Sequence, residues 1–370
     1  METVILPDDK AGVEYAASLL QAGEPVALPT ETVYGLAANA LDPVAVAKIY
    51  QAKGRPSDNP LIVHVTGIEQ GGELAAEIPQ KGLELMQAFW PGPLTIVVPK
   101  NPVIPGITTG GRPDVGLRAP AHPAFQAVLQ AAQLPLAAPS ANVAGRPSPT
   151  TAQHVLQDMN GRIPAILDGG PCAVGVESTV VSVTGTIPVL LRPGGVSLEQ
   201  LQTVVGPVIV DAAVTAQMEA GRSPGAPGMK YQHYAPRTPL TLITGPIAHQ
   251  VEIVRAASAD RATAEQAGEA LQRLCPLTQP AGGQACVGGS VGVLCFDDDA
   301  ALFSGLPHIT YGPRHDAAAQ AQQLFSALHQ IDSLGVSQVY AQISPSQTGV
   351  FLAVRNRLLK AAGHRIIELA

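Results

Sequence analysis

Short apolar runs alternate with amphipathic stretches along residues 1–210 of the chain. A continuous apolar run of about four to eight residues is typical of a buried strand, whereas apolar positions spaced about three or four residues apart are typical of a helix. On this basis we predict strands at residues 25–29, 61–65, 94–99, 115–120, 165–168, 178–183 and 189–193.

Helix boundaries in the same region carry their own signals. Asp8 or Asp9 can cap a helix that ends near Gly23, and Asp42, followed by proline, can cap one that stops near Gly54. Strands and helices alternate irregularly, so we expect an α/β protein with a twisted mixed sheet and flanking helices. Further helices are expected at residues 81–90 and 121–133, and a short helix with a capping box is expected to begin at Ser197 with Gln200.

Residues 211–238 differ in composition from both flanks. They are dense in Pro and Gly, with interleaved Tyr and His rings, which predicts an interdomain linker between a first domain at 1–210 and a second at 239–370. In the second domain, regular alternation of strands and helices predicts a smaller, Rossmann-like parallel-sheet α/β domain. The expected strands are 240–244, 291–296, 336–343 and 364–369, the helices lie near 316–334 and 349–361, and 276–290 is an expected loop.

Composition narrows the classes of protein to which the chain can belong. Charged residues make up 14% of the chain, against about 25% in a typical domain, and the net charge is −7. Nucleic-acid modules need a surplus of Lys and Arg, so a broadly basic nucleic-acid-binding protein is disfavoured, while a local basic cleft stays open. The 37 Gly and 34 Pro show no collagen period and indicate a loop-rich fold.

Cysteine spacing and hydropathy indicate a cytoplasmic protein. The four Cys residues show no C-x-x-C spacing, so we expect reduced thiols rather than a disulfide framework or a zinc site. No apolar run reaches the roughly 18 residues of a membrane span. The opening METVILPDDK lacks the basic region of a signal peptide. We therefore expect neither a membrane segment nor a membrane partner.

Polar and cationic residues follow several predicted strands, where α/β proteins usually bind ligands. Thr30 and Thr32 follow the first predicted strand, and a turn built by helix-capping hydroxyls is the alternative. Lys53 and Arg55 lie in a Gly/Pro-held loop, with Asn59 just beyond. A mobile point charge beside a planar fork suits phosphate oxygens, while a solvated surface pair is the alternative.

His64 and Arg118 stand in or at the end of apolar strands. For His64 the alternative is a satisfied core histidine. A buried unpaired charge is costly, so Arg118 should meet an anion, either a protein carboxylate or a substrate carboxylate. The other candidates are Ser140, Asn142 and Ser148 in one loop, where an ordinary Ser/Asn turn is the alternative, and Ser178 and Arg192 at strand ends.

Cations, hydroxyls and amides dominate this set, with few carboxylates or histidines. Such a site binds anions and stabilises charge, and it is poorly equipped for general-base catalysis. The chain contains no G-x-S-x-G elbow, no H-E-x-x-H, no P-loop and no Rossmann glycine fingerprint.

Seven motifs occur in one order: PTETVYGLAANA, AKGRPSDNPLIVHV, FWPGPLT, VGLRAPAHP, APSANVAGRPSPT, VESTVVS and LLRPG. They resemble the YrdC-like family, and APGMKYQHYAP resembles the linker of its long two-domain members, the threonylcarbamoyl-adenylate synthases. Ser182 departs from the aspartate that the family often has after STVV. The alternatives are a double-stranded-RNA-binding or ribosome-maturation module and, last, the carbamoyl transfer of hydrogenase maturation.

The resemblance implies a reaction and a set of partners. L-threonine, bicarbonate and ATP would give L-threonylcarbamoyl-AMP and pyrophosphate, with Mg²⁺ accompanying ATP and no dedicated metal site. The product would pass to a separate tRNA threonylcarbamoyl transferase, and direct tRNA contact stays open.

The resemblance also implies residue roles. Lys53 and Arg55 would be catalytic, and Tyr231 in the linker would close over the nucleotide. Threonine would bind Thr32, His64, Arg118, Ala138 (through its backbone) and Ser178. ATP would bind Arg55, Asn59, Ser140, Asn142, Ser148, Arg192 and Tyr231.

Overall fold

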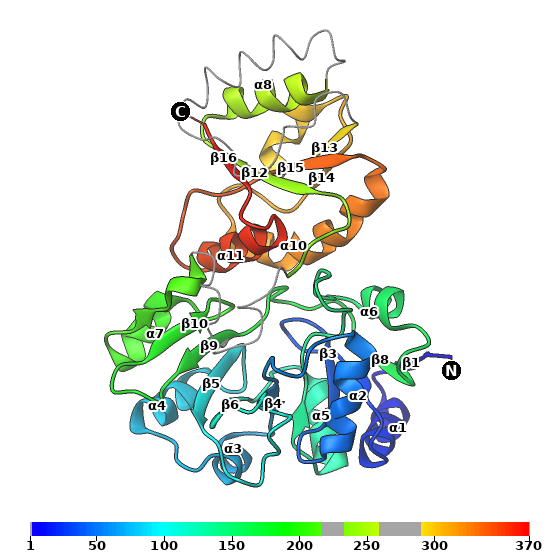
Figure 1. The fold of residues 1–370 in the computed structure, drawn as a ribbon, viewed down its shortest axis with the longest axis vertical. Coiled ribbons are helices and arrows are strands. Elements are labelled where there is room, and N and C mark those ends of the chain that lie inside the picture. The colour runs from blue at the N-terminus through cyan, green and yellow to red at the C-terminus, as the bar shows by residue number, and fades with distance from the viewer. Residues whose placement is uncertain (1, 216–232, 259–289, 370) are drawn as a thin grey trace. The chain divides into compact units, whose positions relative to one another are not determined.

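A computed structural model describes residues 2–215, 233–258 and 290–369 (Figure 1). The chain divides into two compact units. The first comprises Met1–Tyr231 with Thr348–Ala353, and the second comprises Gln232–Gln347 with Val354–Ala370. Most of the expected linker and of the expected loop at 276–290 lie outside the described residues, and the domain boundaries drawn from the sequence stay a prediction.

A mixed sheet of eleven strands forms the centre of the first unit, in the order β1-β8-β2-β3-β7-β4-β6-β5-β9-β10-β11. Its strands are β1 (Val4–Pro7), β2 (Val26–Leu28), β3 (Gly35–Asn39), β4 (Ile62–His64), β5 (Leu94–Pro99), β6 (Asp114–Arg118), β7 (Leu136–Ala137), β8 (Ala165–Asp168), β9 (Thr179–Ser182), β10 (Val189–Arg192) and β11 (Ile209–Val210). The helices are α1 (Lys10–Gln21), α2 (Pro43–Lys53), α3 (Ile68–Leu74), α4 (Gln80–Phe89), α5 (Pro123–Ala132), α6 (Ala152–Met159) and α7 (Leu198–Val205), followed by the 3₁₀ turn η1 (Ala212–Val214). The mixed sheet with flanking helices is the expected architecture.

The helix caps are those that the sequence predicts. The Asp9 side chain accepts from the Gly12 N–H at the start of α1, and Asp42 caps α2. At α7, Ser197 and Gln200 form the complete capping box. A cap satisfies a backbone N–H that has no partner inside its helix, and it typically contributes about 1 kcal/mol.

The segment after β2 is not the helix-capping turn that was the alternative for Thr30 and Thr32. The hydroxyls of Thr30 and Thr32 cap no helix, because the chain turns back and forms β3 antiparallel to β2. The side chains of β3 are small, so local β propensity is weak and the strand depends on pairing with β2 and β7.

The strand register brings distant residues together at one edge of the sheet. β4 lies between β6 and β7, so His64 pairs in register with Arg118 on one side and with Leu136 on the other. β5 and β9 run parallel, and β9 and β10 run antiparallel. The ends of β4, β6, β9 and β10 therefore carry the candidate residues to neighbouring positions.

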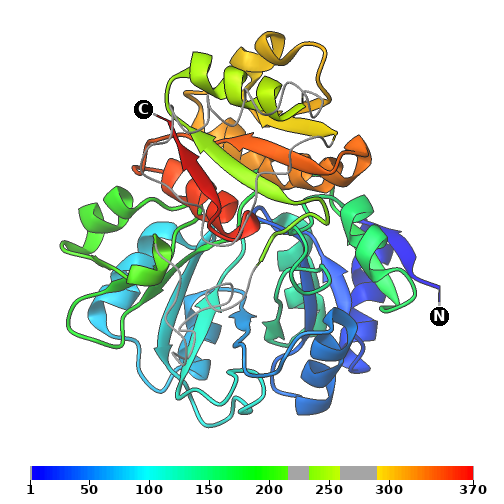
Figure 2. The same ribbon diagram turned by 45° about the horizontal axis from the view of Figure 1, so that its top comes forward.

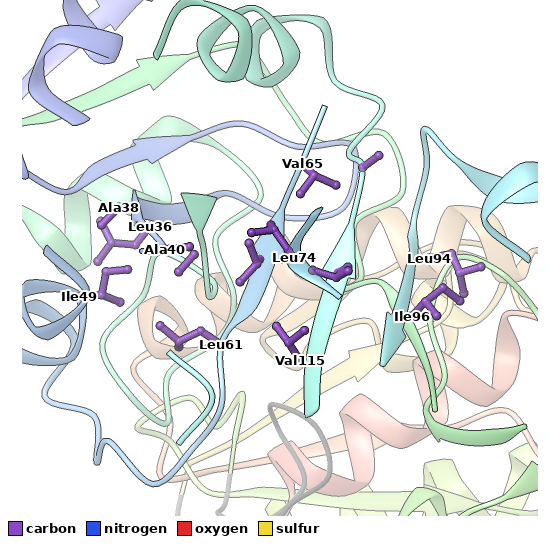
Figure 3. Close-up of a cluster of buried hydrophobic side chains, with 14 of the residues drawn as sticks. Leu36, Ala38, Ala40, Ile49, Leu61, Val65, Leu74, Leu94, Ile96 and Val115 are labelled. Atoms are coloured by element: carbon purple, nitrogen blue, oxygen red, sulfur yellow. The ribbon is translucent and has the colours of Figure 1, made fainter. Parts of the chain in front are cut away.

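A continuous apolar core fixes these strands (Figure 3). Leu36 and Ala38 from β3 pack with Ile49 from α2, and Leu94 and Ile96 extend the same cluster from β5. All five side chains are fully buried. Burying a side chain of the size of Leu or Ile stabilises the fold by about 1.5–3 kcal/mol, so the sheet is a rigid support for the residues at its edge.

The second unit contains five parallel strands in the order β14-β13-β15-β12-β16. The parallel sheet agrees with the sequence prediction, but β14 is not among the four strands that the sequence predicts. Helix α8 covers one face of this sheet, and α10 and α11 cover the other (Figures 1 and 2). Its elements are β12 (Leu240–Thr244), α8 (Ile247–Ser258), β13 (Val291–Cys295), η2 (Asp297–Phe303), β14 (His308–Thr310), α10 (Ala317–Gln330), η3 (Ile331–Leu334), β15 (Gln338–Gln342), α11 (Phe351–Ala361) and β16 (Ile366–Glu368). Within residues 2–215, 233–258 and 290–369, no helix has the length and apolar character needed to cross a membrane.

Candidate active site

The turn between β2 and β3 presents a pair of buried hydroxyls. Thr30 Oγ1 donates to the Val33 carbonyl at 2.7 Å and lies 2.8 Å from Thr32 Oγ1. The Thr30 proton goes to Val33, and its lone pairs receive the N–H groups of Thr32 and Val33 at 3.1 and 3.2 Å, so Thr30 donates nothing to Thr32 Oγ1. The lone pairs of Thr32 Oγ1 stay open, so this hydroxyl can accept from a ligand.

Arg118, at the end of β6, meets a protein carboxylate. Its Nη2 donates to Glu31 Oε1 at 2.7 Å and its Nε to the Gly92 carbonyl at 3.3 Å. Glu31 Oε2 accepts from the Ala121 N–H at 3.1 Å, which fixes the carboxylate. Among the described residues, none contacts Arg118 Nη1 through a hydrogen bond. The guanidinium is therefore anchored at one end and open at the other.

His64 is buried beside this guanidinium. Its exposed fraction is 3%, and its ring lies 5.2 Å from the Phe125 ring. Burial, together with the Arg118 charge, lowers the pKa of His64 to about 3. Nδ1 is buried and has no hydrogen-bond partner in the described part of the chain. His64 is thus a neutral polar ring with an unused nitrogen, which differs from a satisfied core histidine.

Ala138 follows β7 at the same edge. Its N–H donates to the Ile62 carbonyl at 3.0 Å. The backbone contact that the resemblance implies for Ala138 is therefore left to its carbonyl oxygen, which can accept from a ligand.

Lys53, the last residue of α2, is buried instead of solvated. Its Nζ donates to the carbonyl of Asn142 at 2.7 Å and to the carbonyl of Ser140. Burial and then the nearby charge of Arg55 hold the pKa of Lys53 well below its usual value, while Asp158 and Glu177 oppose this shift. Because an ammonium carries three donors, one N–H is left for another acceptor.

The side-chain amides of Asn59 and Asn142 each have a buried oxygen that receives no hydrogen bond from the described residues. Asn142 donates from Nδ2 to the carbonyls of Val143 and Arg146 at 2.8 and 2.9 Å, which fixes the orientation of its amide. The Oδ1 atoms of Asn142 and Asn59 are buried without hydrogen-bond partners in the described structure. Arg55 Nη2 donates to the Asn59 carbonyl at 3.3 Å. Buried amide oxygens in ordinary turns accept hydrogen bonds, so these two oxygens are suited to accept from a ligand.

Ser148, in the loop at 140–148, contacts the segment that precedes β9, and that segment in turn contacts the end of β10. Ser148 Oγ donates to Glu177 Oε1 at 2.5 Å. Next to Glu177, Ser178 accepts from Arg192 at both its hydroxyl and its carbonyl oxygen. Glu31 and Glu177 therefore hold site residues, although neither is among the candidates that the sequence predicts. Both glutamates stand within the quoted motifs, but their partners are distant in sequence.

The contacts assemble most of the candidate residues. Thr32, His64, Arg118 and Ala138 lie at the ends of β2, β4, β6 and β7, and Lys53 connects to Ser140 and Asn142. Tyr231 lies outside the described residues. Within the described ranges, no group of three or more His, Cys, Asp or Glu side chains is placed to hold a metal ion.

Comparisons with known proteins cover nearly the whole chain. Residues 18–194 match the family model described as "Telomere recombination", and residues 196–363 match "Threonylcarbamoyl-AMP synthase, C-terminal domain". The threonylcarbamoyl-AMP synthase of Bacillus subtilis is 44% identical over 96% of this chain and 94% of its own length. That of Pyrococcus abyssi is 40% identical over 96% of each chain.

A solved structure agrees with the fold. The crystal structure of P. abyssi Sua5 complexed with L-threonine has a TM-score of 0.86 at 39% identity and covers 100% of both chains. Fold, site and relatives together define an enzyme of the nucleotidyltransferase class. The chain belongs to the threonylcarbamoyl-AMP synthase family, which confirms the resemblance that the motifs carry.

Proposed function

We propose that the chain makes L-threonylcarbamoyl-AMP and pyrophosphate from L-threonine, bicarbonate and ATP. The observation that carries this proposal is the state of Arg118. The Gly92 carbonyl accepts from its Nε and Glu31 accepts from its Nη2, while Nη1 has no hydrogen-bond partner among the described residues. A buried guanidinium with one open end suits the carboxylate of an amino acid.

The groups around Arg118 fit the rest of an amino acid. Thr32 Oγ1 has open lone pairs, and the Ala138 carbonyl is an acceptor, so both can receive the amine or hydroxyl protons of threonine. His64 is neutral because burial lowers its pKa to about 3, and it adds no positive charge to compete with Arg118. The site therefore combines one cationic anchor with several acceptors.

The chemistry requires little proton transfer by the protein. The neutral threonine amine adds to CO₂ derived from bicarbonate; the amine proton and the hydroxide that bicarbonate loses leave as water, and the resulting carbamate is already an anion. One carbamate oxygen then attacks the α-phosphorus of ATP, the bond to the β-phosphate oxygen breaks, and pyrophosphate leaves with the electron pair. Catalysis consists of bringing anions together and stabilising charge, which positioned cations can do.

Arg55 and Arg192 supply cations for the phosphates, with Lys53 beside them. The two Lys53 hydrogen bonds hold the carbonyls of the 140–142 loop, and its remaining N–H is free to meet an oxygen of the substrate. Asn59, Ser140, Asn142 and Ser148 would complete the ATP subsite. We expect Mg²⁺ to arrive with ATP, bound mainly by phosphate oxygens and water.

Two further parts of this proposal rest on family membership. Tyr231 would close over the nucleotide. The labile product would pass to a separate transferase that modifies tRNA to N6-threonylcarbamoyladenosine. Since the net charge is −7, we propose no extended tRNA-binding surface, and direct contact with tRNA stays open.

Pyrophosphate release from ATP by the purified full chain tests the function. We expect release only when L-threonine and bicarbonate are both present, with bicarbonate-depleted buffer and omission of threonine as controls. Pyrophosphate release that continues at the same rate without L-threonine or without bicarbonate would contradict the proposal. Tight binding of duplex RNA with no pyrophosphate release would favour the RNA-binding module instead.

A further inference from the structure

The hydroxyl of Ser178 is held by side chains from two other strands. Arg192, at the end of β10, donates from Nη2 to Ser178 Oγ at 3.2 Å and from Nε to the Ser178 carbonyl at 3.1 Å. Thr95 on β5 lies with its Oγ1 2.8 Å from Ser178 Oγ. Thr95 is fully buried, and Ser178 is 1% exposed. Neither hydroxyl has a further hydrogen-bond partner among the described residues.

The number of protons in this cluster limits its arrangements. A hydroxyl has one proton to donate and two lone pairs that accept, whereas a guanidinium only donates. One lone pair of Ser178 Oγ is therefore taken by Arg192. Two hydroxyl protons, on Thr95 and Ser178, remain to be placed, and the contact between them uses only one.

The two arrangements leave different protons without an acceptor. If Ser178 donates to Thr95, the Thr95 proton is stranded in a fully buried place, which is costly. If Thr95 donates to Ser178, the Thr95 hydroxyl is satisfied and both Ser178 lone pairs are filled. The remaining proton then belongs to Ser178, at the residue that borders the substrate site.

We propose that Thr95 is a positioning residue that sets the hydroxyl of Ser178 as a donor toward an acceptor oxygen of the amino-acid substrate. This inference rests on the proposed function. A carboxylate or carbamate oxygen completes the hydrogen bonding of the cluster, whereas an ammonium group finds no open lone pair on Ser178. Thr95 thereby makes Ser178 a hydrogen-bond donor to the substrate without contacting the substrate itself.

The surroundings of Thr95 hold its side chain in one orientation. A Cβ built on Gly116 of β6 would lie 3.1 Å from Thr95 Cγ2, so the methyl group fills the space that this glycine leaves. The methyl group packs against Gly116 and the hydroxyl contacts Ser178, so both groups on the Thr95 Cβ have a fixed neighbour and the side chain is held in one rotamer. Valine in the same place would keep the shape and remove only the donor.

Two matched comparisons separate the hydroxyl from the volume of the side chain. Thr95→Val replaces the hydroxyl with a methyl at constant shape, and Thr95→Ala differs from Thr95→Ser only by the hydroxyl. We expect the KM for L-threonine to rise about tenfold in the Val and Ala variants, while the Ser variant stays near the wild-type value. The KM for ATP should change less than twofold in all three, because Arg192 keeps both contacts with Ser178.

Thr3→Val is the control, because Thr3 is a buried threonine whose hydroxyl, among the residues that the structure describes, contacts only Met159, Gly161 and Ile163. It should leave both KM values unchanged. Equal rises in the KM for threonine and for ATP, or failure of Thr95→Ser to keep the wild-type KM, would overturn the inference and assign Thr95 to sheet packing. If the wild-type chain released no threonine-dependent pyrophosphate, the proposed function itself would fail.

Discussion

The neutral state of His64 has a consequence for stability that can be measured without any substrate. Burial and the Arg118 charge lower the pKa of His64 from its usual 6.5 to about 3 in the folded chain. Between these two values the unfolded chain binds a proton that the folded chain does not. Stability therefore rises with pH across this window and falls when the solution is acidified from pH 7.

The size of the loss follows from the two pKa values. At pH 7 the unfolded histidine is mostly neutral, and the cost to folding is about 0.2 kcal/mol. At pH 5 it is almost fully protonated, and the cost grows to about 2 kcal/mol. Acidification from pH 7 to pH 5 should thus destabilise the wild type by about 2 kcal/mol more than His64→Gln, whose side chain does not titrate.

Urea unfolding followed by tryptophan fluorescence measures this difference. The chain has one Trp, Trp90, which lies in the first unit and donates from its indole to the Leu94 carbonyl at 2.7 Å. The signal therefore reports the unit that contains His64. All other titrating groups are common to both proteins and cancel in the comparison. Equal pH dependence in the wild type and His64→Gln would refute the buried, neutral histidine.

Three other substitutions test the charges and the backbone of the site. Glu31→Gln removes the only carboxylate that pairs with Arg118 in the described structure. It should lower the free energy of unfolding, measured in urea, by about 3 kcal/mol and raise the KM for threonine. Unchanged stability would show that the pair is not buried as a unit. Lys53→Met removes the amine that donates to two loop carbonyls, so pyrophosphate release should fall by at least about a hundredfold. Lys53→Arg should restore little of this activity. Near-normal release would show that this lysine is not part of the site. Gly194→Ala places a Cβ 2.3 Å from backbone atoms of the 177–179 segment, so unfolding should need less urea and activity should be lost together with it, whereas a fully active variant would contradict this packing.

The parts of the fold that local sequence determines were predicted well. Asp9, Asp42 and the Ser197 capping box set their helix ends through contacts within a few residues, and these signals stand in the sequence itself. β3 was missed because its small residues form a strand only when β2 and β7 lie beside it. Periodicity carries no information about such partners.

The same distinction explains the site. The sequence indicates that Arg118 needs an anion, since a charge closing an apolar strand must be paired. It does not identify Glu31, because that partner lies 87 positions away and meets Arg118 only after the sheet has formed. The position of Thr95 opposite Ser178 likewise depends on the pairing of β5 with β9.

The order of strands at the site also bears on when a newly made chain can begin to work. The strands that carry the candidate residues are neighbours in the order β7-β4-β6-β5-β9-β10, which is not their order of synthesis. Arg192 is the last of these residues to be synthesised, and it donates two hydrogen bonds to Ser178. The family resemblance assigns Arg192 to ATP and Ser178 to threonine. If Ser178 binds threonine as proposed, a nascent chain interrupted before Arg192 lacks the guanidinium that donates to this serine. Under the proposed function, activity therefore requires that every strand of the first sheet up to β10 has been translated.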